Sequence, residues 1–255
     1  MDSNVPLRSQ AGALQAAVSR MFDTMNVAYD SHFEFHPRII DFLSHFGALF
    51  TLNQDMLLER LYTRVLSQNV SAGGRWRGAI LPGMRQARKI RQSNGVEFWS
   101  EYEWEPVAEN ERPASEDPGL QPIFKLHGSS QWYATKGVSP ILIIGGDKAQ
   151  SLRQFDILRW YSERFSDWLS RDVRLLVIGY SFRDPHINDA LILAAERGLE
   201  LFVVDPNGPA AGEGSPQIKA LFRKALIGAS RRPLVETLLN DRAEASKISR
   251  FLAGQ

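Results

Sequence analysis

The chain has 255 residues, with 30 lysines and arginines against 29 aspartates and glutamates, and its formal net charge of +1 gives no indication of direct nucleic-acid binding or of attraction to an acidic membrane. The absence of cysteine excludes disulfides, a cysteine zinc site and a thiol nucleophile. No apolar run reaches transmembrane length and the polar start lacks the apolar core of a signal peptide, so we expect a cytoplasmic protein without a membrane partner.

The first predicted element is a helix over residues 11–25, where apolar side chains recur at helical spacing. A loop follows, with histidines at positions 32 and 36, a spacing that two ligands of one metal ion could have. Pro37 disfavours the helical region for His36, and no glutamate stands beside the first histidine as in zinc proteases. We interpret this segment as a loop and predict no metal site.

A short helix is predicted over 37–45, a strand over 46–50 and a helix over 56–66, whose apolar residues lie on one side. The polar stretch Thr51-Leu-Asn-Gln-Asp55 joins the last two elements. Asn53 and Asp55 therefore belong at the carboxyl end of a strand, where open α/β sheets bind their ligands.

Residues 67–122 differ in character and are interpreted as a small insertion beside the sheet. They contain a basic run around Trp76, for which a solvated face or a rim attracting an anionic ligand is the preferred interpretation and a nucleic-acid contact the alternative. Aromatic and acidic residues alternate over 96–107, which indicates a strand or hairpin with one covered face.

Further short strands are predicted over 123–126 and 140–144, the first ending in His127-Gly-Ser-Ser-Gln-Trp132. An amphipathic helix follows, with its apolar stripe from Leu158 to Leu169. The next segment reads as one βαβ unit: an apolar strand over 175–178, a turn at Gly179, a helix capped by Asp184 with Pro185 in its first turn, and a strand over 199–204. A helix over 217–226 and a helical tail complete the chain.

These elements predict one α/β domain over 1–255, with a Rossmann-like, doubly wound, mostly parallel sheet, the insertion at 67–122 and a helical C-terminal segment at 216–255. Polar residues gather at three predicted strand ends. They are Thr51, Asn53 and Asp55; His127 and Ser129; and Ser181, Asp205 and Asn207. Such clustering on one edge of a sheet favours a ligand site.

The ordered motifs Thr51-Leu-Asn-Gln-Asp55, Lys125-Leu-His-Gly-Ser129 and Gly179-Tyr-Ser-Phe-Arg-Asp-Pro-His-Ile-Asn188 together resemble the sirtuin-like NAD-binding family. The resemblance covers residues 37–207. The form of the last motif, with Lys148 upstream, is similar to a zinc-free bacterial branch that includes NAD-degrading effectors of anti-phage defence.

The resemblance implies a role for each matching residue. Asn53 would hold the nicotinamide-side ribose or the attacking water, Asp55 would contact the carboxamide, and His127 would be the general base. The remaining NAD contacts would come from Thr51, Gly128, Ser129, Gly179, Ser181, Asp205 and Asn207. Of these, Gly179 and Ser181 would line the phosphate path, and Asp205 or Asn207 would bind the adenosine ribose.

The chemistry of the reaction agrees with these residue roles. Cleavage of the nicotinamide–ribose bond develops oxocarbenium character, so it needs groups that position ribose and water. Imidazole titrates near neutrality and suits the base. Nicotinamide is a good leaving group, so no carboxylate pair is required.

Two departures from the family pattern matter. Without cysteine the zinc ribbon of the protein deacylases is absent, which favours NAD hydrolysis over deacylation. The Gly-Ala-Gly-x-Ser turn that opens the family's first strand is also not found, so we expect an N-terminally incomplete domain or a pyrophosphate held differently.

The leading hypothesis is an NAD glycohydrolase with NAD as substrate and no metal. Alternatives are a catalytically silent module that binds NAD or ADP-ribose or mediates assembly, a transferase of ADP-ribose or acyl groups, and an α/β domain without surviving activity. We also expect a homo-oligomer or a partner defence protein, because the truncated sheet would expose its ends beside the helical tail.

Overall fold

The computed structural model describes residues 37–62, 76–87, 90–93, 96–99, 103–113, 117–134, 140–143, 154–170 and 172–254, together with 13, 17, 18, 20–22, 24 and 25. The histidines at 32 and 36, Lys148 and much of the predicted N-terminal helix lie outside this set. The chain divides into two compact units, Met1–Tyr161 and Ser162–Gln255.

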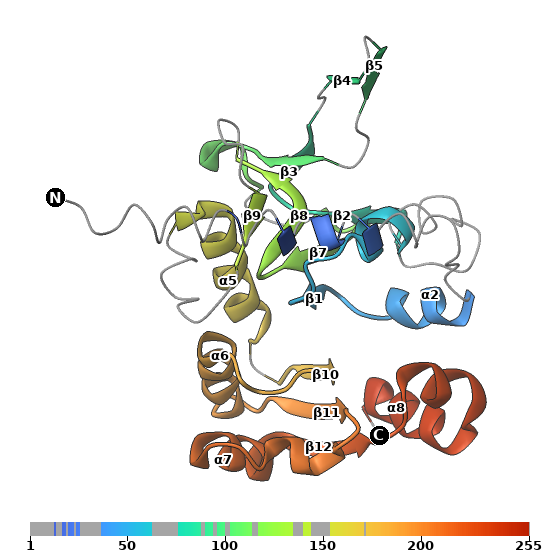
Figure 1. Ribbon diagram of the computed structural model, residues 1–255. Helices are drawn as coiled ribbons and strands as arrows, with labels where there is room; N and C mark the ends of the chain where they lie inside the picture. Colours follow the sequence, from blue (N-terminus) through green and yellow to red (C-terminus); the bar gives the residue numbers. More distant parts are fainter. Residues whose placement is uncertain are drawn as a thin grey trace, which may run out of the picture. The chain divides into compact units, whose positions relative to one another are not determined.

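The first unit is built on a three-stranded parallel sheet (Figure 1). Its order is β1 (Leu49–Thr51), β7 (Leu120–Lys125) and β2 (Gly78–Ile80). In the register of β1 and β7, Thr51 lies opposite Lys125, so both strands end together. Helix α2 (Pro37–Ser44) precedes β1, and the π-helix η1 (Leu58–Tyr62) follows it after a turn.

A mixed sheet and a hairpin complete the strands of this unit. The mixed sheet has the order β3 (Met84–Gln86), β6 (Trp104–Pro106), β8 (Gly128–Tyr133) and β9 (Pro140–Leu142). The hairpin pairs β4 (Ile90–Ser93) with β5 (Val96–Trp99), and a 3-10 helix, η2, spans Glu109–Glu111. The segment 96–107, predicted to contain a strand or hairpin, contains β5, which pairs with β4, and β6, which pairs with β3 and β8.

The core of the first unit is aromatic. Phe124 of β7 stacks on Phe50 of β1 at 4.8 Å between ring centroids, and its other neighbour is Tyr161, edge-on at 5.0 Å. Tyr161 belongs to helix α5 (Asp156–Trp168), also touches the buried Trp132 of β8, and donates its hydroxyl proton to the Pro82 carbonyl. Through Tyr161, helix α5 thus packs against both the parallel sheet and the mixed sheet.

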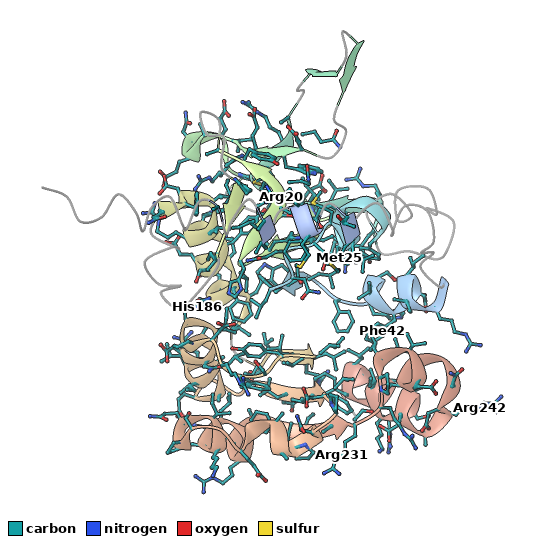
Figure 2. All side chains as sticks on the ribbon, viewed as in Figure 1. Arg20, Met25, Phe42, His186, Arg231 and Arg242 are labelled. Atoms are coloured by element: carbon teal, nitrogen blue, oxygen red, sulfur yellow. The ribbon has the colours of Figure 1, made fainter. Side chains whose placement is uncertain are left out.

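The second unit is a three-stranded parallel sheet with the order β10 (Arg174–Ile178), β11 (Glu200–Val204) and β12 (Leu226–Ser230). Helix α6 (Pro185–Ala195) links β10 to β11, and α7 (Pro216–Ala225) links β11 to β12 after the 3-10 helix η3 (Gly208–Gly212). The π-helix η4 (Glu236–Asn240) and helix α8 (Arg242–Ala253) follow. Phe202 of β11 packs against Phe251 of α8, whereas the exposed Arg231 and Arg242 point away from this unit (Figure 2).

The two parallel sheets with their helices confirm the predicted α/β, Rossmann-like fold with mostly parallel strands. Five strands differ from the prediction. Strands β2, β3 and β4 come from the segment 67–122 but lie outside its predicted strand or hairpin at 96–107, and β2 belongs to the parallel sheet. Strands β8 and β12 occupy segments expected to be turn or helical tail. The predicted helix over 56–66 is described as η1, and the residues beyond 62 lie outside the described set.

The basic run around Trp76 is largely paired where the structure describes it. Arg77 lies 3.1 Å from Asp117, and Arg85 lies 2.8 Å from Glu105. Trp76 is buried and its indole N–H donates to the Ser44 carbonyl at 2.8 Å. Trp76 therefore has no exposed ring face for stacking on a nucleic-acid base, and the solvated face or rim for an anionic ligand stays a prediction.

Candidate functional site

Residues 51–55 form a tight turn shaped by two of the predicted site residues. The Asn53 amide donates to the Thr51 hydroxyl at 3.0 Å, and the Leu57 amide donates to the Asp55 carboxylate at 2.9 Å. These side-chain-to-backbone bonds two residues apart are the local alternative to helical bonding that Thr and Asp favour. They leave Asn53 at the exposed position of the turn.

This turn is hydrogen-bonded to the turn that carries His127. The Leu126 amide donates to the Thr51 carbonyl at 2.9 Å, and the Ser130 amide donates to the Gln54 carbonyl at 3.0 Å. The Gln54 side chain donates to the carbonyls of His127 at 3.2 Å and Ile143 at 2.6 Å. Two predicted clusters, 51–55 and 127–129, are thereby brought together in the first unit.

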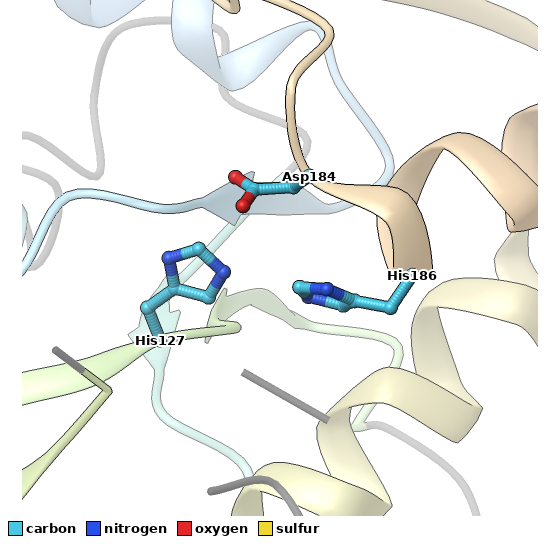
Figure 3. A group of neighbouring side chains, drawn as sticks. All are labelled: His127, Asp184 and His186. Carbon is cyan, nitrogen blue, oxygen red and sulfur yellow. The ribbon is translucent and has the colours of Figure 1, made fainter. Parts of the chain in front are cut away.

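His127 stands between β7 and β8, and its buried side chain is drawn in Figure 3. Gly128 follows with φ +77°, and a Cβ there would overlap the Ile141 carbonyl oxygen across the β8–β9 pair. Only glycine meets both requirements. Gly128 therefore sets the direction in which the chain leaves His127.

Ser129 is fully buried. Its hydroxyl lies 3.2 Å from the Glu59 carboxylate, 3.4 Å from the Gln54 carbonyl and 3.0 Å from the Met56 sulfur. These partners all belong to the segment that follows β1. The hydroxyl is therefore engaged in the interior of the unit.

The second unit carries the other predicted residues. Gly179, at φ +63°, ends β10, and its amide donates to the Val204 carbonyl at the end of β11. Ser181 is exposed in the following turn. The parallel pairing of β10 with β11 thus places Gly179 and Asp205 at one edge of the sheet.

The turn after Gly179 is held by polar contacts that the sequence did not suggest. The Tyr180 hydroxyl donates to the Asn188 side chain at 2.9 Å, and the Asn188 amide group donates to the Phe182 carbonyl, also at 2.9 Å. Phe182 has φ +54°, a conformation rare for a residue with a side chain. The side-chain hydrogen bonds of Asn188, on α6, therefore stabilise this strained turn.

Asp184 occupies the N-cap of α6 as predicted, but its side chain makes no capping hydrogen bond. His186 lies in the first turn of the same helix (Figure 3). Pro185 provides the helix start, since its fixed φ suits the first helical position.

Asp205 and Asn207 follow β11. The Asp205 carboxylate accepts a hydrogen bond from the Asn207 amide at 2.8 Å, and its side chain is buried. Asn207 is exposed. Asp205 therefore stabilises the turn through the Asn207 main-chain N–H. The side-chain carboxamide of Asn207 is accessible to solvent.

The residues predicted to bind NAD thus form two groups. The first group, in the unit Met1–Tyr161, contains Thr51, Asn53, Asp55, His127, Gly128 and Ser129. The second group, in the unit Ser162–Gln255, contains Gly179, Ser181, Asp205 and Asn207. That the two groups act on the same ligand stays a prediction.

The sequence did not assign a role to Lys125 or Glu59, which form a buried ion pair beneath the first group. In the sequence, Lys125 is only the residue before Leu126 and His127, and Glu59 is only a charged residue between leucines of a predicted helix. The pattern of apolar residues gave no indication that Glu59 is buried, because its burial depends on Lys125 from another segment.

Comparison with known proteins supports the motif-based resemblance. A family model described as a SIR2-like domain matches residues 47–225. No curated protein matches the chain. In the described part of the chain, none of the helices combines the length and apolar character needed to cross a membrane.

Proposed function

The chain belongs to the SIR2-like domain family, and we propose that it is an NAD glycohydrolase that cleaves NAD to nicotinamide and ADP-ribose. We further place it in a zinc-free bacterial branch that acts in anti-phage defence in the cytoplasm, in a single domain over 1–255 with its insertion at 67–122. The absence of cysteine supports this branch, because a cysteine zinc ribbon is impossible here.

The proposal rests on one observation, the hydrogen bonds that connect the Asn53 turn to the His127 turn. Three hydrogen bonds join these turns, and the Gln54 side chain also donates to the Ile143 carbonyl beyond β9. A carboxamide at an exposed position and an imidazole on an adjoining turn are the two polar groups that ribose hydrolysis requires.

In the proposed reaction a water attacks C1′ of the nicotinamide ribose. Its oxygen forms a bond to C1′, the C1′–nitrogen bond breaks, and the bonding electrons neutralise the pyridinium ring of the departing nicotinamide. His127 accepts the proton of the water, and Asn53 holds the ribose or the water in line. Asp55 contacts the carboxamide, and no general acid is needed.

The second group of residues would bind the rest of NAD. Gly179 and Ser181 would line the pyrophosphate, with the glycine permitting close backbone approach. Asn207, with Asp205, would accept and donate hydrogen bonds to the adenosine ribose. A homo-oligomer or a partner defence protein is part of this proposal.

The test is to incubate the purified chain with NAD and to separate nicotinamide and ADP-ribose by chromatography. We expect equimolar products from the wild type and none from Asn53→Ala. Asn240→Ala removes an exposed asparagine that bonds Glu236 in η4 and serves as the matched control, which should keep full activity. Equal product formation by Asn53→Ala would contradict the proposal.

A second candidate is a catalytically silent module that binds NAD or ADP-ribose, since no Gly-Ala-Gly-x-Ser turn stands among the 255 residues of this sequence. A ligand that binds only the folded chain raises its apparent stability, by about 2.7 kcal/mol at a concentration of about 100 Kd. A thermal shift with NAD that remains intact in the sample would select this candidate over the glycohydrolase.

A further inference from the structure

A buried charged group lies beneath the Asn53 turn. The Lys125 ammonium is 2.8 Å from the Glu59 carboxylate, and each side chain is 1% exposed. Lys125 also donates to the main-chain carbonyl of Asp55. Lys125 is the last residue of β7 and Glu59 belongs to η1, so the pair connects the end of a sheet strand to the segment after β1.

The same carboxylate is connected to β8. The Ser129 hydroxyl donates to Glu59 at 3.2 Å. Glu59 therefore bonds one residue on each side of His127: Lys125, at the end of β7, and Ser129, near the start of β8. The turn that carries His127 is thus anchored at both of its ends.

Stability alone does not account for a buried ion pair. Removing two charges from water costs more than their attraction commonly returns, and apolar side chains of similar volume often serve as well or better. In this group desolvation raises the pKa of Glu59, although the nearby Lys125 ammonium acts in the opposite direction. What the pair provides, and apolar residues would not, is a directed set of hydrogen bonds.

We propose that Lys125 and Glu59 are positioning residues for nicotinamide release, because they fix the main chain at Asp55 against the turn of His127. The inference rests on the function proposed above and deepens it. Displacement of a reacting group by about 1 Å costs about 100-fold in rate. Ser129 acts through Glu59 and does not bind NAD.

The first test is the double variant Lys125→Met/Glu59→Gln, which removes both charges. Either single substitution would leave a buried charge without its counter-ion and would endanger folding. For the double variant we expect kcat to fall by about 10- to 100-fold with KM for NAD within about 3-fold of the wild type. Wild-type kcat in the folded double variant would overturn the proposal.

The matched control is Arg85→Met/Glu105→Gln. This pair also has a nitrogen–oxygen distance of 2.8 Å, but it joins β3 to β6 and its side chains are 54% and 19% exposed. It carries no bond to either turn. Its kcat and KM should both equal those of the wild type.

A second measurement does not depend on activity. The amides of Leu57, Leu126 and Ser130 donate to Asp55, Thr51 and Gln54 respectively, so their hydrogen exchange reports the joined turns. We expect faster exchange at these amides in Lys125→Met/Glu59→Gln and no change in the control pair. A wild type that releases no nicotinamide would contradict the function, whereas unchanged exchange in the double variant would contradict the positioning role.

Ser129→Ala tests the proposal with a milder change. A positioning role through Glu59 predicts a lower kcat, faster exchange at the same amides and an unchanged KM for NAD. A direct contact with NAD predicts the opposite pattern, a raised KM with kcat unchanged. The second pattern would overturn our assignment of Ser129.

Discussion

At Gly128 the backbone conformation and the available space both require glycine. The residue has φ +77°, and a methyl group there would meet the Ile141 carbonyl oxygen of the neighbouring strand. We predict that Gly128→Ala lowers the free energy of unfolding by about 2–4 kcal/mol, because it combines backbone strain with overpacking.

Urea unfolding measures this loss. Gly214→Ala is the matched control, since Gly214 has ordinary φ and no atom within 4 Å of the added methyl group. Its free energy of unfolding should change by less than about 0.5 kcal/mol. Equal stability of the two variants would show that Gly128 is not constrained as described.

Glu59 gives a prediction at the same scale for the pH dependence of stability. Burial raises its pKa above the ordinary value of 4.5. Between 4.5 and the raised pKa the folded chain keeps a proton that the unfolded chain has released, so this group makes stability fall as pH rises through that interval. Lys125→Met/Glu59→Gln lacks the group, and its stability should fall less.

The comparison needs urea unfolding of both proteins at several pH values from 4.5 upward. The quantity of interest is the difference between their free energies of unfolding, in which the titrating groups common to both proteins cancel. We expect that difference to shift against the wild type as pH rises. A difference independent of pH would contradict the raised pKa.

Among the elements, α8 shows how side chains fix a helix start. The Asp241 carboxylate accepts hydrogen bonds from the Ala243 amide at 3.0 Å and the Glu244 amide at 3.1 Å. We predict that Asp241→Ala costs about 1 kcal/mol of stability, measured by urea unfolding, because two amides lose their partner. Asp241→Asn keeps an accepting oxygen and should cost less; an equal loss in both variants would refute the capping role.

The elements also show what the sequence could predict. Strands β10 and β11 are continuous apolar runs and α6 lies between them, so local pattern was sufficient. Strand β2 has only 3 residues, both β2 and β12 contain glycine, and their pairing depends on strands distant in the chain. Strand β8 opens with the polar residues Gly128-Ser-Ser-Gln131 and reads as a turn, because the buried Ser129 hydroxyl finds its partners only in the folded unit.

The candidate site divides in the same way. The turn of Asn53 and the turn of His127 could be predicted as neighbours, because both follow strands that end at one sheet edge. The pairing of Lys125 with Glu59 could not, since the two residues come from separate segments and nothing local marks them as partners. The engaged state of the Ser129 hydroxyl likewise depends on the fold.

For the whole molecule, the SIR2-like match runs from residue 47 to 225. It includes the first parallel sheet, strands β10 and β11 of the second, and both groups of predicted NAD-binding residues. If both groups act on one substrate, substitutions in the second unit should change the reaction. We predict that Asn207→Ala raises KM for NAD about 2- to 10-fold with kcat unchanged, because the variant loses one hydrogen bond to the adenosine ribose. Initial rates over a range of NAD concentrations measure it, and an unaltered KM would remove Asn207 from the site.

The role of His127 is the central claim, and its direct measurement is the rate of nicotinamide release at saturating NAD by wild type and His127→Ala. His45→Ala is the matched control, because His45 is exposed at the end of α2 and its ring bonds the Asp41 carbonyl at 2.7 Å. General-base catalysis predicts that kcat falls by at least about 100-fold in His127→Ala and stays unchanged in His45→Ala. Wild-type release by folded His127→Ala would contradict the account.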